Sequence, residues 1–478
     1  MAESQGSRPP AGTPPPQSQS PAYAQDLSRS LGLRENMFIT LSAVTPASSV
    51  FIIMPSVISG LGGAAALAFA LAAVAGMLMA FCYAELSSAF PITGGEYAFA
   101  ARTLGRATGF ALFALSLLAG VLTVAVIALG TGDYLGVVWD SLGGKRTGLA
   151  VIAVASLVSV LGIRTNAWVT GVFLAVELAA IAVLAWLGLV NVEQPISTLW
   201  TPHALGEDGV LVGASAGLVS SFAASALFAY NGYGTSVYYA EETREVSSIG
   251  RIVMWSLGIT VVAECLPLVA VLLGTPSTSA LMAAPSPMNY FLLERGGDTV
   301  NTVVSLGIAI AIVNAVIAIM LQIGRLVYSS ARDRAWPDVV GRPLAAVHPR
   351  LRTPVAATLS MGAAAIVVAW LVPLDKLILA TGANLVLLYI FVAVAALYGR
   401  ISGATAHATY RMPAWPWVPV AAIGVMAYVL YEAIDADWRP AGIAVAMVAA
   451  GYLYYYAYLY PRRAHRWTMP DPVRDTTE

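Results

Sequence analysis

Long apolar segments, separated by short polar stretches, make up most of the chain from residue 36 onward. A helix needs about 20 mostly apolar residues to cross a bilayer. Segments of about that length predict twelve membrane-spanning helices, at 36–60, 63–89, 107–137, 148–163, 167–191, 212–240, 251–274, 301–330, 354–372, 376–399, 415–433 and 441–460. We therefore expect an all-α integral membrane protein.

The basic residues support this division of the chain. All 25 Lys and Arg residues lie outside the centres of the predicted spans. With both termini in the cytoplasm, 20 of them fall in cytoplasmic regions and 5 in outer loops, namely Lys145, Arg146, Arg295, Lys376 and Arg439. Cytoplasmic loops of membrane proteins carry an excess of Lys and Arg. The sequence thus predicts a multi-pass protein of the cytoplasmic membrane with cytoplasmic N- and C-termini.

The composition agrees with a membrane protein and excludes other classes. Of the residues, 58% are hydrophobic and 11% charged, with a mean hydropathy of +0.75, whereas soluble domains carry about 25% charged residues. A net charge of −1 gives no argument for a nucleic-acid partner. Cys82 and Cys265 lie in apolar segments and suggest neither a disulfide nor a metal cluster. The four histidines lie in loops and the sequence has no phosphate-binding loop, so we expect neither an enzyme nor a cofactor.

Two of the predicted spans contain helix breakers near their middle. Pro46 interrupts the first span, and Tyr-Asn-Gly-Tyr-Gly at 230–234 interrupts the sixth. Proline removes a backbone donor, and glycine costs a helix about 1 kcal/mol relative to alanine. Non-helical backbone at membrane depth is tolerated only inside protein or along a cavity. Breaks at corresponding positions of two halves indicate a transporter site between inverted repeats.

This pairing divides the chain, because each broken span is the first of a group of five. The predicted parts are a disordered, Pro- and Ser-rich cytoplasmic tail (1–33), a first five-helix repeat (34–200), a second, inverted five-helix repeat (201–400), two further helices (401–460) and a cytoplasmic C-terminal tail (461–478).

Short motifs then indicate a family. They are A-S-S-V-F at 47–51 followed by Pro55, Y-A-E-L at 83–86, P-I-T-G-G-E-Y at 91–97, F-A-Y-N-G-Y followed by E-E-T within 228–243, R-L-V-Y and A-R-D at 325–333 followed by Pro337, and Pro354. With these motifs in this order, the chain resembles the amino acid permeases of the amino acid–polyamine–organocation (APC) superfamily, which have the LeuT-type fold. The resemblance covers residues 34–460. The chain departs from these permeases at Ala47 and Ser49, which replace glycines, at Asn231, which replaces an apolar residue, and at Glu177, which stands where many relatives have lysine.

The resemblance implies a secondary active transporter that moves an amino acid by alternating access. It places the carboxylate-binding turn at Ala47, Ser48 and Ser49, next to Thr45, and the ammonium-binding carbonyls at Phe228, Ala229 and Tyr230. It also implies an aromatic gate at Tyr233, after Gly232. Asn231 either binds a polar group of the substrate or caps the broken helix, and both roles fit the sequence.

Three acids lie within or at the ends of spans, where ionisable groups are costly and usually functional. We expect Glu177 to be the proton-coupling residue, because burial disfavours a charged carboxylate and no span offers a base. The alternative is a permanently protonated Glu177 bonded to a carbonyl of the first helix. We assign Glu85, Glu264 and Asn314 to polar support, Asn314 being equally suited to facing the substrate.

Two further features concern coupling and the gate. Sodium coupling is disfavoured, since the eighth span has no Ser/Thr pair to hold the ion. Glu241 and Glu242, near Arg244 and Arg251, resemble the ion pairs of a closed cytoplasmic gate.

Alternatives to proton-coupled symport remain open at this point. An amine or polyamine transporter and an amino acid exchanger both fit the sequence, and so does a nutrient sensor that binds without transporting. An acidic substrate is disfavoured by the absence of bases from the spans. We expect a monomer or homodimer without a heavy-chain subunit, because the outer loops contain no cysteine.

Overall fold

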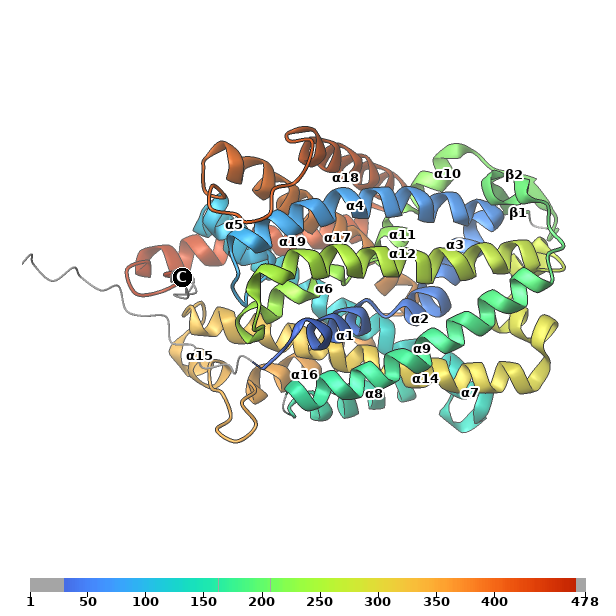
Figure 1. The fold of residues 1–478 in the computed structure, drawn as a ribbon, viewed down its shortest axis with the longest axis horizontal. Coiled ribbons are helices and arrows are strands. Elements are labelled where there is room, and N and C mark those ends of the chain that lie inside the picture. Colours follow the sequence, from blue (N-terminus) through green and yellow to red (C-terminus); the bar gives the residue numbers. More distant parts are fainter. Residues whose placement is uncertain (1–29, 162, 207, 470–478) are drawn as a thin grey trace, which may run out of the picture.

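The computed structural model of the protein describes residues 30–161, 163–206 and 208–469, and its helices run mainly along the long axis of the molecule (Figure 1). The long helices are α4 (Ala65–Ala89), α6 (Arg106–Leu129), α8 (Lys145–Ser159), α9 (Ile163–Val190), α12 (Ile249–Gly274), α14 (Pro287–Arg332), α16 (Val355–Leu371), α17 (Leu374–Ile401), α18 (Trp417–Ala436) and α19 (Trp438–Tyr454). The predicted N-terminal tail lies outside the described residues up to position 29.

Shorter helices complete the bundle. They are α1 (Leu33–Val44), α2 (Pro46–Ser48), α3 (Met54–Leu61), α5 (Glu96–Thr103), α7 (Thr131–Val138), α10 (Ala216–Ser221), α11 (Ala223–Ala229), α13 (Thr278–Ala283) and α15 (Asp338–Leu344), with π-helical turns at Ser49–Ile53 and Tyr455–Leu459 and 3-10 turns at Gly62–Ala64, Asp140–Leu142, Ile196–Trp200, Tyr233–Glu242, Val246–Ser248 and Tyr460–Arg462. Much of the molecule therefore consists of apolar helix, as the hydropathy pattern predicts.

Eight helical stretches among the described residues are long and apolar enough to cross a membrane. One of them, Leu33–Ala89, contains both the first and the second predicted span, whereas α16 is a shorter apolar helix. Large apolar side chains such as Trp186, Trp255 and Leu371 lie exposed on the outside of long helices, where a bilayer would cover them. The protein is thus a mostly helical membrane protein.

A small β-hairpin, β1 (His203–Leu205) and β2 (Leu211–Gly213), lies at one end of the bundle (Figure 1). Its strands pair antiparallel, with Ala204 opposite Val212. The predicted start of the sixth span at residue 212 is therefore wrong, because Val212 belongs to a strand and helix begins only at Ala216. Apolarity alone does not distinguish a short strand from the first turn of a helix.

The chain is interrupted at both of the places that the sequence marks. Thr45 adopts a left-handed conformation, with φ 51° and ψ 71°, between α1 and α2. From Pro46 the helix resumes and continues through the π-helical turn and α3 to Leu61. In the sixth span, α11 ends at Ala229, and Gly232, with φ 114°, precedes the 3-10 segment that begins at Tyr233. Helix α12 lies between α4 and α9 (Figure 1) and packs against both.

Candidate functional site

The two helix breaks lie in direct contact. A Cβ atom on Gly232 would lie 2.8 Å from the Cα of Val44, the last residue of α1. Backbone this close can only be opposed by glycine, whose positive φ also disfavours any other residue. A second contact joins the breaks, because the Ser49 hydroxyl donates to the carbonyl of Ala229 at 2.7 Å. Two predicted site segments, 180 residues apart in the chain, thereby form one structure.

The break in the first span presents its amide groups to a buried acid. The backbone N–H of Ala47 donates to Oε1 of Glu177 at 2.7 Å, and the Thr45 hydroxyl donates to the Ser48 hydroxyl at 2.7 Å. The first N–H groups of a helix have no partner within the helix and lie at the positive end of its dipole. Glu177 is therefore bonded to an amide of the first helix rather than to a carbonyl.

A second acid, Glu264 of α12, is also completely buried. Neither oxygen of Glu264, nor Oε2 of Glu177, has a hydrogen-bond partner among the described residues. The nearby Ser49 hydroxyl gives its proton to Ala229, so it can only accept from Glu264. A buried carboxylate without donors is costly. Two acids next to one helix break, with no arginine or lysine bonded to either in the described chain, can hold protons or attract a cation.

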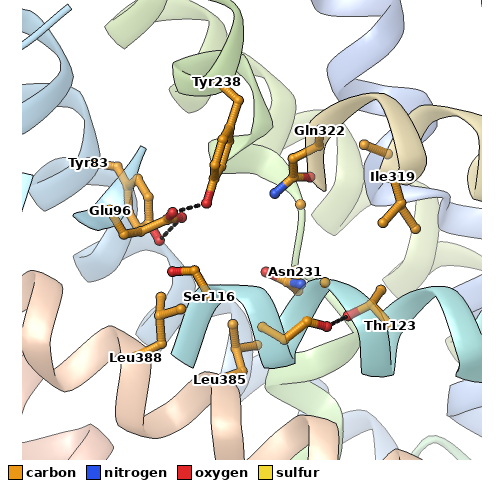
Figure 2. A pocket seen from close by; sticks show the side chains of 14 residues that line it. Tyr83, Glu96, Ser116, Thr123, Asn231, Tyr238, Ile319, Gln322, Leu385 and Leu388 are labelled. Carbon is orange, nitrogen blue, oxygen red and sulfur yellow. Dashed lines mark hydrogen bonds between the residues drawn. The ribbon is translucent and has the colours of Figure 1, made fainter. Parts of the chain in front are cut away.

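A small cavity of about 50 Å³ lies beside the sixth-span break (Figure 2). Asn231, Gly232, Glu96 and Tyr238 are among the residues that line it. The remaining walls come from α1, α4, α6, α14 and α17, with Gln322 and Ser116 among the polar side chains. A cavity of this volume has room for a few water molecules. This cavity is therefore much smaller than a typical ligand pocket of about 300–1,000 Å³.

Glu96 is a polar residue of this cavity that the sequence analysis did not select. Its carboxylate accepts hydrogen bonds from the hydroxyls of Tyr83, at 2.8 Å, and of Tyr238 (Figure 2). Burial raises the pKa of Glu96, while the two phenol donors act in the opposite direction. The signal for Glu96 was its place within the motif P-I-T-G-G-E-Y at 91–97.

The aromatic residues expected at the site point in different directions. The Tyr230 hydroxyl contacts the carbonyl of Phe69 at 3.2 Å and the sulfur of Cys265 at 2.9 Å. The ring of Tyr233 lies edge-on to Tyr83, with 5.9 Å between ring centroids. Phe228 is buried.

The remaining polar candidates already have partners. Asn231 accepts from the hydroxyl of Tyr389 at 3.4 Å. Asn314 donates to the carbonyl of Thr170 at 3.4 Å, and its side-chain oxygen has no partner among the described residues. Glu85 is held by Arg400 through two contacts of 2.6 Å, which ties α4 to α17. Glu85 therefore lies in an ion pair, away from the helix breaks.

Two ion pairs join the 3-10 segment Tyr233–Glu242 to α14. Glu242 accepts from Arg325 at 2.5 and 3.0 Å, and both side chains are buried. Glu241 accepts from Arg332 at 2.8 and 3.2 Å. Arg244 and Arg251 lie near these acids in the sequence, whereas the partners in the structure, Arg325 and Arg332, come from α14. These two arginines could have been found from the sequence, because an arginine at the end of an apolar helix needs a partner for its charge.

Comparison with known proteins identifies the family of the chain. A family model described as amino acid permease matches residues 31–454. The chain belongs to the amino acid permease family. The resemblance read from the motifs is therefore confirmed, and so is the expectation of a transporter rather than an enzyme.

The relatives of this permease are transporters. It is 24% identical to the methylthioribose transporter of Bacillus subtilis over 91% of this chain and 95% of that protein. It is 21% identical to the branched-chain amino acid permease BcaP of the same organism, over 91% and 94% of the two chains. It is also 26% identical to human cationic amino acid transporter 4, over 70% of this chain and 53% of that protein. The permease thus has a small-molecule substrate and works in a lipid bilayer.

Proposed function

We propose that this permease moves an amino acid across the cytoplasmic membrane by alternating access, as a proton-coupled symporter in which Glu177 carries the proton. The observation that supports it most is that two broken helices meet beside an acid that has no basic partner among the described residues. Amide groups at one break suit a carboxylate, and carbonyls at the other suit an ammonium group. Relatives that carry amino acids support the substrate class.

The proposal includes the finer architecture. We take the protein to have twelve spans, an inverted 5+5 repeat of the LeuT type and cytoplasmic termini. The substrate-binding residues in this proposal are those of the two breaks, Thr45, Ala47, Ser48, Ser49, Phe228, Ala229, Tyr230, Asn231, Gly232 and Tyr233. The end of the bundle that carries the Glu242–Arg325 pair is then cytoplasmic, and the structure corresponds to a state closed on that side.

A second candidate substrate is an amine. It is favoured by the absence of a basic partner for Glu177 and Glu264 among the described residues, because two buried acids attract a cation. A thermal-shift panel of the common amino acids and of simple amines separates the candidates. Stabilisation by amino acids supports the main proposal, and stabilisation by amines alone overturns it.

Uptake into proteoliposomes tests transport and coupling. Wild-type protein should accumulate the radiolabelled amino acid when the outside is more acidic. Glu177→Gln should abolish this accumulation and spare exchange, because the amide still accepts from Ala47 but cannot bind a proton. Normal proton-driven uptake by the variant would remove the role of Glu177. Binding without flux under any gradient would indicate a sensor instead of a transporter.

A further inference from the structure

The amide of Ala47 already binds a carboxylate, and that carboxylate belongs to the protein. Pro46 has no N–H, so Ala47 offers the first amide of the continuous helical stretch that runs from Pro46 to Leu61. Its hydrogen bond to Glu177 measures 2.7 Å and is completely buried. A hydrogen bond that involves a charged group is about twice as strong as a neutral one. The contact shows that this amide can donate a hydrogen bond to a carboxylate.

No cation among the described residues forms an ion pair with Glu177. From α12 it faces Glu264, another acid, together with the thiol of Cys265 further along. The ionisable side chains of α14 lie within its first twelve and last eight residues, and Asn314 between them is uncharged. Those of α1 are Arg34 and Glu35 in its first turn, and α2 has none. Across the described residues, the amide of Ala47 donates to Oε1 of Glu177, and the neighbouring Thr45 hydroxyl gives its proton to Ser48 rather than to Glu177.

We propose that Glu177 occupies the position that a substrate carboxylate takes, so that an amino acid binds by displacing Glu177 from the Ala47 amide. This inference rests on the proposed function, since it requires a substrate with a carboxylate. In the exchange, the hydrogen bond from Ala47 to Glu177 breaks and one to the substrate forms. Glu177 takes one proton from water and leaves as a neutral acid, because a second carboxylate without donors would be stranded beside Glu264.

The competition makes binding of a carboxylate and uptake of a proton a single event. A ligand with an ammonium group but no carboxylate does not displace Glu177 and takes up no proton. Proton uptake can therefore be compared between an amino acid and the amine that lacks only its carboxylate. Any difference between the two reports displacement of Glu177 from the Ala47 amide. Proton coupling then follows from the shared amide and needs no conformational signal between distant sites.

Isothermal titration of the purified, full-length protein tests this with L-leucine and 3-methylbutylamine, and with L-lysine and cadaverine as a second pair. Each titration is made in buffers of different ionisation enthalpy, which gives the number of protons taken up. At a pH where Glu177 is ionised in the ligand-free protein, we expect one proton for each amino acid and none for each amine. The amino acid affinity should rise by up to about tenfold for each unit of decrease in pH, the limit for one linked proton. The amine affinity should stay constant.

Two variants assign the proton. In Glu177→Gln the amino acid affinity should become independent of pH, whereas Glu193→Gln, the same change in a half-exposed acid that pairs with Arg295 away from the breaks, should keep the wild-type slope. If Glu177→Gln does not fold, the proton count on the wild type decides alone. A proton taken up with the amines as well, or an amino acid affinity independent of pH, would overturn the inference.

The outcome is separable from that of the proposed function. Protein that binds leucine with one proton but accumulates nothing in proteoliposomes would contradict the proposed transport and leave the competition standing. Proton-driven uptake that Glu177→Gln abolishes, combined with binding that is independent of pH, would leave transport standing and contradict the competition.

Discussion

Gly232 is the residue on which contact between the two breaks depends. Replacement by alanine should reduce stability by about 1–3 kcal/mol for the positive φ alone. Further loss should come from the backbone of Val44, since an added Cβ would lie 2.8 Å from its Cα. We expect a lower melting temperature in detergent and loss of substrate uptake.

Gly258 of α12 provides the matched control. A Cβ there meets no atom within 4 Å, and alanine stabilises a helix by about 0.5–1 kcal/mol relative to glycine. Gly258→Ala should therefore keep or raise the melting temperature. Equal behaviour of the two variants would mean that the close approach of Gly232 to Val44 does not hold in the membrane.

Single residues show which features of the two helix breaks can be predicted from the sequence. Pro46 and the glycines at 232 and 234 marked both breaks, because backbone preferences are local. The contact of Glu177 with Ala47 spans 130 residues, and no local preference encodes it. The sequence predicted that Glu177 is buried and that no span offers it a base. Its hydrogen-bond partner, an amide rather than a carbonyl, depends on how α9 packs on the break and could not be predicted.

The Glu242–Arg325 pair joins the 3-10 segment after the sixth-span break to α14. Both side chains are about 1% exposed. Removing one partner of a buried pair leaves an uncompensated charge and costs about 3–5 kcal/mol. Arg325→Met should therefore strongly lower resistance to unfolding by SDS in mixed micelles. The double variant with Glu242→Met should recover much of the loss.

An exposed pair serves as the comparison. Lys376 and Asp375 lie 3.9 Å apart with side chains 60% and 70% exposed, and such pairs contribute about 0–1 kcal/mol. Lys376→Met should leave unfolding nearly unchanged. A loss as large as that of Arg325→Met would show that the assay reports something other than the buried pair.

Helix boundaries depended on more than hydropathy. The spans around α12 and α17 were predicted closely, because each is one uninterrupted apolar run. The sixth predicted span is divided into α10, α11 and a 3-10 segment, with a strand at its start. There the interior of the protein satisfies backbone groups that lipid could not, as when the Ser49 hydroxyl donates to the carbonyl of Ala229 at the end of α11.

The arrangement of the whole molecule relates its ends to the two sides of the membrane. The β-hairpin and the helix α15 lie at opposite ends of the bundle (Figure 1). The predicted topology places the loop before the hairpin outside and α15 inside, and it rests on the excess of basic residues in the proposed cytoplasmic regions. Both regions expose apolar residues that tolerate replacement, Ile196 at 65% and Val339 at 89%.

Cysteine labelling tests this orientation. The native Cys82 is buried and Cys265 is half-buried, so the wild-type chain gives the background. A membrane-impermeant maleimide should label Ile196→Cys on intact cells and Val339→Cys only after permeabilisation. The reverse pattern would invert the molecule. The buried Glu242–Arg325 pair would then close its outer side, and the half-helix amide bound to Glu177 would have to receive substrate from the cytoplasm.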